Sequence, residues 1–322
     1  MARKPKTPKP PKPPKDRYKY GIAEWFGHPF ALMTVEQRQH YATELALPKR
    51  ERPRHLCPFQ SYGERQVYCS KINDGAVCST RLYKLVGATR EIEIVPSPRG
   101  SIRTLCPARF MENGTIFQWI GEVILNHPSP VVVNQVSYLQ RPLTDSQTPE
   151  SEADFKDVGR IDHVLMNPDT KDWCALEIQA VYFSGGAMGA EFAAIRQSTS
   201  PTIPFPVGSR RPDDRSSGPK RLLPQLQTKV PSLRRWGKKM AVVIDEGFFA
   251  SLGPMRNVPH VSNADIIWFV VRFDESTGRP VLAQGPIHRT RLEDAIDGLT
   301  GGEPVSKEEF ERRIEEKLAV LP

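Results

Sequence analysis

Two carboxylates and an amide stand within apolar segments near the middle of this 322-residue chain. Asp162 lies in the apolar stretch 158–166, and Glu177 and Gln179 lie in the stretch 173–183. The sequence Asn-Pro-Asp-Thr at 167–170 is typical of a tight turn, which predicts that the two stretches pair as an antiparallel hairpin. Because side chains alternate between the two faces of a strand, Glu177 and Gln179 are expected to point the same way.

A carboxylate in such a strand is costly to bury unless it is paired or binds a cation. Mg²⁺ accepts one or two protein carboxylates and keeps waters and phosphate oxygens as its other ligands. The hairpin therefore predicts a magnesium site for phosphate-ester hydrolysis, held by Asp162 and Glu177, with Gln179 orienting a water. The same spacing also fits a location at a sheet edge, or ion pairs with Arg160 or Lys171.

Four cysteines form a second candidate site. Thiolates at Cys57, Cys69, Cys78 and Cys106 can hold a tetrahedral metal, and zinc or iron fits their softness. Their intervals are long and contain no C-x-x-C, so scattered free thiols are an equal alternative. Cys174 lies in the apolar stretch 173–183, where a packed free thiol is expected. The seven histidines show no metal spacing, and the sequence has no nucleophile-elbow, P-loop or dinucleotide-binding motif.

The net charge of +8 is unevenly distributed. Residues 1–20 carry a net charge of +7 and residues 196–239 carry +9, so the remaining chain is acidic. The segment 196–239 is expected to be a basic loop in which Arg210, Arg211 and Arg215 contact DNA phosphates or guanines, or else a solvated insertion. Few cysteines, no apolar leader and no membrane-length apolar run predict a cytoplasmic protein without membrane contact.

The elements that must position these residues can also be read from the sequence. Thr34 and Gln37 form a capping box for a helix that ends before Pro48, and residues 48–110 are expected to be irregular. Further elements are expected as helices at 112–126, 188–196 and from Thr290 and Ser306, as strands at 131–139, 158–166, 173–183, 240–244 and 265–273, and as a loop at 141–156. This order predicts a mixed α/β core behind an irregular four-cysteine module.

Several strings together resemble the NotI-type type II restriction endonucleases over about residues 20–195. They are GIAEWFGHPF, the cysteine strings CPF, YCSK, GAVCSTRLY and CPARF, the helix IFQWIGEVIL, and above all VGRIDHVLMNP with WCALEIQAVYFSG. The resemblance implies a PD-(D/E)XK nuclease core at 111–322 behind a metal module at 20–110. Composition alone predicts a basic, Pro- and Lys-rich disordered tail at 1–19, which the resemblance does not reach. Asp162 and Glu177 match the metal carboxylates, and Gln179 takes the usual lysine position.

The resemblance also implies iron in the four-cysteine site. It further implies a homodimer that cuts a GC-rich palindrome in double-stranded DNA, with a cognate methyltransferase. This chain has Asn134 and Gln135 where the family tends to have an acid, and Glu122 is one candidate to replace it. That difference supports one rival function, a DNA-binding member with weak or no nuclease activity. A repair or mobile-element nuclease is a further alternative.

Overall fold

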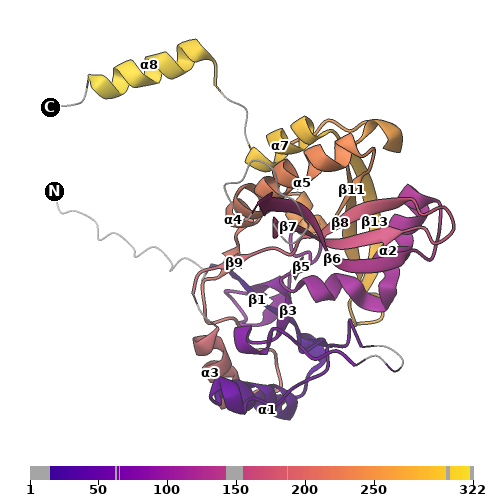
Figure 1. Cartoon of the computed structure of the whole chain (residues 1–322). Helices are drawn as coiled ribbons and strands as arrows, with labels where there is room; N and C mark the ends of the chain where they lie inside the picture. The colour runs from indigo at the N-terminus through magenta and orange to yellow at the C-terminus, as the bar shows by residue number, and fades with distance from the viewer. Residues whose placement is uncertain are drawn as a thin grey trace, which may run out of the picture.

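The computed structural model describes residues 15–61, 64, 66–142, 155–186, 188–301 and 305–319. Most of the predicted basic tail lies outside these residues, but strand β1 already begins at Arg17, within the tail predicted to extend to residue 19. Two larger sheets, a two-stranded sheet of β9 and β10, and their covering helices make up the body of the described protein (Figure 1). The predicted mixed α/β class is confirmed.

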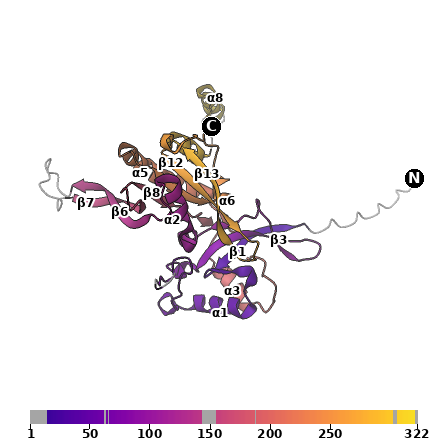
Figure 2. The same cartoon turned by 90° about the vertical axis from the view of Figure 1, so that its right-hand side faces the viewer.

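A six-stranded mixed sheet forms the larger half, in the order β13-β12-β11-β8-β7-β6. Strands β6, β7 and β8 pair antiparallel, β8, β11 and β12 run parallel, and β13 returns antiparallel. Their bounds are β6 Val131–Pro142, β7 Phe155–Met166, β8 Trp173–Ile178, β11 Met240–Asp245, β12 Ile266–Asp274 and β13 Val281–Thr290. The long hairpin of β6 and β7 projects from the sheet in Figure 2.

The predicted hairpin of β7 and β8 is confirmed, and its turn forms for the expected reason. The Asn167 side-chain oxygen accepts hydrogen bonds from the backbone N–H groups of Asp169 and Thr170, at 2.9 and 3.2 Å. Strand β8 ends at Ile178 instead of Phe183. Residues 143–154 of the expected loop lie outside the described residues, while 141–142 and 155–156 belong to strands.

The two faces of this sheet pack against different helices. Cys174 and Leu176 point into a core covered by α2 (Thr115–Ile120) and the π-helical turn Gly121–Leu125, as expected for 112–126. Ala175 points to the opposite core, covered by α5 (Leu223–Arg235) and α7 (Leu292–Thr300). The alternation read from the sequence is therefore present in the structure, and Cys174 is a packed free thiol as predicted.

The basic segment 196–239 was expected to be a loop, which is correct for residues 198–210 but wrong for residues 214–235. It contains α4 (Asp214–Ser217), a π-helical turn (Gly218–Leu222) and α5, which run on from one another. Leu222, Leu226, Val230 and Leu233 recur at helical spacing and are buried against the sheet. This packing outweighs the two prolines inside the helix, Pro224 in its first turn and Pro231 further along.

The N-terminal half carries a second sheet in the order β2-β1-β3-β4, with β5 paired to β3. Its strands are β1 Arg17–Trp25, β2 His28–Pro29, β3 Val77–Leu85, β4 Ile92–Ile94 and β5 Arg103–Thr104. The long strand β3 corrects the expectation that all of 48–110 is irregular. Helix α1 (Val35–Ala46) has the predicted capping box and packs against α3 (Gly189–Gln197).

The remaining elements include one correction. Thr290 does not cap a helix, because its hydroxyl accepts a hydrogen bond from the Trp268 indole and α7 begins at Leu292. Helix α8 (Lys307–Leu318) is capped by Ser306 as predicted. The short elements are β9 Phe183–Ser184, β10 Arg211–Pro212, α6 Glu246–Phe249, and 3-10 turns at Phe30–Leu32, Lys49–Glu51, Ile72–Asp74, Pro107–Gly114 and Val261–Asn263. Among the described helices, none has the length and apolar character to cross a membrane.

Candidate active site and cysteine cluster

Asp162 and Glu177 lie next to each other on the β7–β8 hairpin. His163 pairs directly with Leu176, so the antiparallel register makes Asp162 and Glu177 the next facing residues. The negative charge of Asp162 contributes to raising the pKa of Glu177, as expected for close carboxyl groups. The hairpin therefore brings together the two carboxylates that the sequence singled out.

Glu177 is buried, with 3% of its surface exposed. Burial raises its pKa, and the ammonium of Lys229 opposes that rise. The Lys229 Nζ donates hydrogen bonds to Glu177 Oε2 at 2.7 Å and to Gln225 Oε1 at 2.9 Å. The ion-pair partner is thus a lysine from α5, whereas the sequence had suggested Arg160 or Lys171.

Asp162 is more accessible than Glu177 and is bordered by β6, the strand on which an acid was expected and which carries Asn134 and Gln135. The Gln135 amide donates to Asp162 Oδ1 at 3.2 Å, and the Asn134 side-chain oxygen lies 2.7 Å from His163 Nδ1. The amides therefore contact this region directly. Glu122 is exposed and accepts a hydrogen bond from Gln118 on its own helix, and its interactions in the described residues do not include Asp162.

Gln179 follows β8 directly and is nearly buried. Its backbone N–H donates to the Val243 carbonyl at 2.9 Å, which extends the sheet by one bond. Its side-chain Nε2 donates to the Ala180 carbonyl at 2.7 Å. The side-chain Oε1 atom is the acceptor of Gln179, and it can accept a hydrogen bond from a water.

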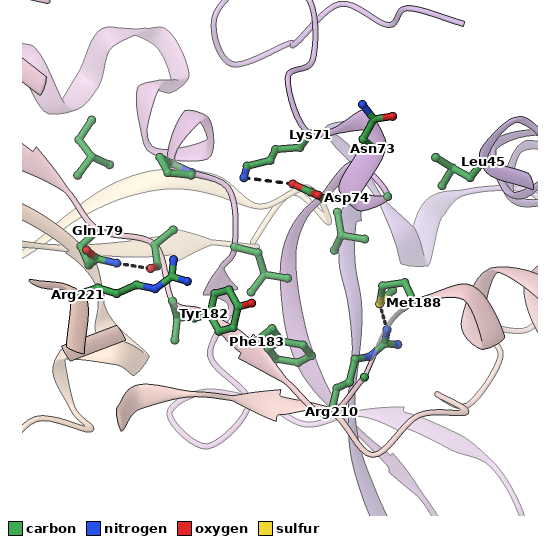
Figure 3. A pocket seen from close by; sticks show the side chains of 18 of the residues that line it. Leu45, Lys71, Asn73, Asp74, Gln179, Tyr182, Phe183, Met188, Arg210 and Arg221 are labelled. Atoms are coloured by element: carbon green, nitrogen blue, oxygen red, sulfur yellow. Dashed lines mark hydrogen bonds and ion pairs between the residues drawn. The ribbon is translucent and has the colours of Figure 1, made fainter. Parts of the chain in front are cut away.

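Glu177 and Gln179 border a cleft of about 1130 Å³ between the two halves of the protein. Its other lining includes Lys71, Asn73 and Asp74 from the N-terminal half and Arg221 from the turn before α5. Figure 3 shows Gln179 and Arg221 on one side of this cavity and Lys71 with Asp74 on another. A predicted carboxylate and the predicted amide therefore both border this cleft.

The four predicted cysteines gather around a much smaller cavity of about 20 Å³. Cys57, Cys78 and Cys106 are buried, and Cys69 is partly exposed. Burial raises the pKa of the Cys78 thiol well above its usual range and that of Cys106 to about 11. Within the described part of the chain, no group of three or more His, Cys, Asp or Glu side chains is already arranged as a ligand set.

The family model described as restriction endonuclease NotI matches residues 41–281 of the chain. This chain belongs to the NotI restriction endonuclease family. Membership makes it a type II site-specific deoxyribonuclease, a class that acts on double-stranded DNA. No curated protein matches the chain.

The matched range in the NotI family contains Asp162, Glu177, Gln179 and all four clustered cysteines. It also contains the three arginines that were predicted to contact DNA, and the structure treats them differently. Arg210 lines the cleft, is largely buried and donates to Glu191 Oε2 at 3.1 Å, and its DNA contact stays a prediction. Arg211 and Arg215 are exposed, and their contacts with DNA stay predictions.

Sequence reasoning missed the cationic residues of this family member that line or adjoin the cleft. Lys229 carried one recognisable signal, because it lies three residues after Leu226 on the apolar face of α5. Arg221 lies over the Tyr182 ring, 4.2 Å from its centroid, and Lys71 lies 3.3 Å from Asp74. No local pattern marks Lys71, whereas Arg221 belongs to the basic segment 196–239. Only the packing of the two halves brings both residues to one cleft.

Proposed function

We propose that this protein hydrolyses double-stranded DNA with Mg²⁺ at a GC-rich palindromic site, using Asp162, Glu177 and Gln179. The observation that carries the proposal is the pair of carboxylates side by side on the hairpin, with Glu177 opening onto the cleft. Two hard oxygen donors next to open space fit an ion that keeps waters and phosphate oxygens among its ligands. A bound Mg²⁺ supplies Lewis acidity toward the phosphate.

The protein's own side chains then have distinct tasks. Asp162 and Glu177 would hold the ion, and burial of Glu177 limits the access of bulk water to its carboxylate. Gln179 Oε1 would accept a hydrogen bond from the attacking water and fix its direction toward phosphorus. The hairpin is rigid because its strands pack on both faces, so these groups are positioned before DNA arrives.

The cleft and its cations support contact with one DNA strand. A volume of about 1130 Å³ accommodates a few nucleotides rather than a whole duplex. Lys71 and Arg221 line this space, and both can pair with phosphate oxygens. One such site cuts one strand, so cleavage of a palindrome calls for a homodimer whose two sites are related by a twofold axis. A cognate methyltransferase would protect host DNA.

We also propose an iron or zinc ion at the four cysteines. Four thiols around one small cavity fit a single soft ion in donor type and in size. Because burial raises the pKa of the Cys78 and Cys106 thiols, the ion must displace their protons to bind. The four positions leave none for a substrate, so the site is structural. In this proposal residues 1–19 are a tail, 20–110 the metal module and 111–322 a PD-(D/E)XK nuclease core.

The second candidate is a DNA-binding member with weak or no nuclease activity. The contact of Gln135 with Asp162 favours it, because an amide replaces a further acid beside the carboxylates. A repair or mobile-element nuclease would instead nick DNA or select particular structures. The same assay separates all three, because each leaves a different product.

The test is incubation of purified protein with GC-rich plasmid DNA and Mg²⁺. Discrete fragments are expected from the wild type. Glu177→Ala should cut at least about 100-fold more slowly, since even the outer partners of metal ligands contribute 10–100-fold. Glu311→Ala, an exposed change on α8, is the matched control. Cleavage by Glu177→Ala at the wild-type rate would refute the proposal, and retarded but uncut DNA would establish the binder.

A further inference from the structure

Lys229 is a buried cation in contact with a predicted metal ligand. Only 7% of its surface is exposed, and its neighbours Leu226 and Val230 pack into the core on the same helix. Lysine is among the residues least often buried, because removing its charge from water is costly. Its ammonium is placed within 2.7 Å of Glu177 Oε2 and 2.9 Å of Gln225 Oε1. Two hydrogen bonds use two of its three N–H groups.

The residue in the usual lysine position does not bring a charge to this site. Gln179 is neutral, and its amide nitrogen is held by the Ala180 carbonyl. Two neighbouring carboxylates repel the further negative charge that develops on the phosphate in the transition state, so a cation beside them favours the chemical step. Arg221 also lines the cleft, but its guanidinium lies over the Tyr182 ring. Among the ion pairs of the described residues, the one made by Glu177 is with Lys229.

We infer that Lys229 is a positioning residue of the cleavage site. From its place on helix α5 it supplies the positive charge that Gln179 lacks. It fixes the orientation of the Glu177 carboxylate and leaves one N–H for the approaching phosphate or water. This inference rests on the proposed function. The alternative role is purely structural: the ammonium would neutralise Glu177 in the folded protein and contribute nothing once a metal ion has bound.

Lys229→Gln tests the inference, because glutamine can still donate to Glu177 but carries no charge. Lys229→Arg keeps the charge, and Lys307→Gln on α8 is the control for loss of an exposed lysine. Three quantities are measured: the single-turnover cleavage rate across a Mg²⁺ titration, Mn²⁺ binding to the DNA-free protein by electron paramagnetic resonance, and DNA affinity in Ca²⁺. Thermal melting checks that each variant is folded.

For Lys229→Gln we expect a rate at saturating Mg²⁺ lower by about 100-fold, the typical loss for one preorganised donor. Mn²⁺ should bind more tightly, because the competing ammonium is gone, while DNA affinity is unchanged. Lys229→Arg should recover part of the rate. A wild-type rate for Lys229→Gln at saturating Mg²⁺ would overturn the inference, as would a slow variant with weakened Mn²⁺ binding.

Failure of the proposed function gives a different pattern. In that case the wild type itself shows no Mg²⁺-dependent cleavage and no Mn²⁺ bound at the carboxylates, and Glu177→Ala behaves like it. The inference about Lys229 then falls as well. If instead the wild type cleaves and Glu177→Ala does not, the outcome for Lys229→Gln decides the inference alone.

Discussion

Replacing Arg109 with methionine removes a fully buried guanidinium from the junction of the two sheets. Its Nε donates to Glu24 of β1 at 2.8 Å, its Nη1 to Glu112 at 2.9 Å and its Nη2 to the Pro280 carbonyl at 2.9 Å. The Phe59 and Phe273 rings flank it, at 4.5 and 4.6 Å from their centroids. One side chain therefore links β1, the cysteine region and β12.

The expected cost follows from what the substitution leaves behind. Glu24 is 1% exposed, and without Arg109 its remaining side-chain donor in the described residues is the Ser79 hydroxyl at 2.6 Å. Breaking a buried ion pair by removing one partner costs about 3–5 kcal/mol of the free energy of unfolding. With a urea slope of about 3 kcal/mol per molar, the midpoint should fall by about 1–1.7 M.

Arg272→Met is the matched control. Arg272 lies 2.7 Å from Glu246, so the pair has the same length, but its side chain is 55% exposed. An exposed pair contributes about 0–1 kcal/mol, because water solvates both charges when they separate. Equal midpoint shifts for the two variants would refute the reasoning that burial, and not distance, sets the cost.

The Arg109→Met penalty should also depend on pH. Burial raises the pKa of Glu24 in the folded protein, and Arg109 opposes that rise. Without Arg109 the folded-state pKa rises further above the unfolded value, so the folded protein holds the Glu24 proton more tightly. The loss of unfolding free energy that comes from Glu24 is then small below the pKa of Glu24 in the unfolded chain. It grows as the pH increases toward the pKa of Glu24 in the folded variant. The difference in midpoint from the wild type should be larger at pH 8 than at pH 5, and a larger difference at pH 5 contradicts the assignment.

The remaining predictions concern the metal module and the cleft. Cys78→Ser should lower the bound metal measured by mass spectrometry and the urea midpoint, without altering the cleaved sequence; a stable, metal-free and fully active variant contradicts a structural metal. Lys71→Gln and Arg221→Gln should each reduce the slope of log affinity for DNA against log salt by about 1, as for the loss of one phosphate contact. Arg210→Gln should leave that slope unchanged and lower the stability of the fold, because Arg210 pairs with buried Glu191. A changed slope would instead indicate that Arg210 contacts DNA.

Local chemistry explains why part of the site could be predicted. The turn at Asn167 and the period-two alternation around Glu177 act over a few residues, so the hairpin and its facing carboxylates follow from the sequence. The cluster of four cysteines around one cavity agrees with the predicted grouping, although its metal stays a prediction. Family membership was likewise carried by contiguous strings, and the family match confirms it.

Tertiary packing decided the rest. Lys229 and Glu177 are separated by 52 positions, and only the docking of α5 on the sheet joins them. The same docking stabilises a helix in residues 214–235 of a basic segment that looks irregular in the sequence. Burial of its apolar residues contributes more free energy than its prolines cost. The basic composition of its segment led us to expect Arg210 to be exposed, but the fold around α3 makes it a buried partner of Glu191. The sequence by itself thus determined which carboxylates face each other, because a strand's period is local. Which charges surround them was set by long-range burial, which no local pattern records.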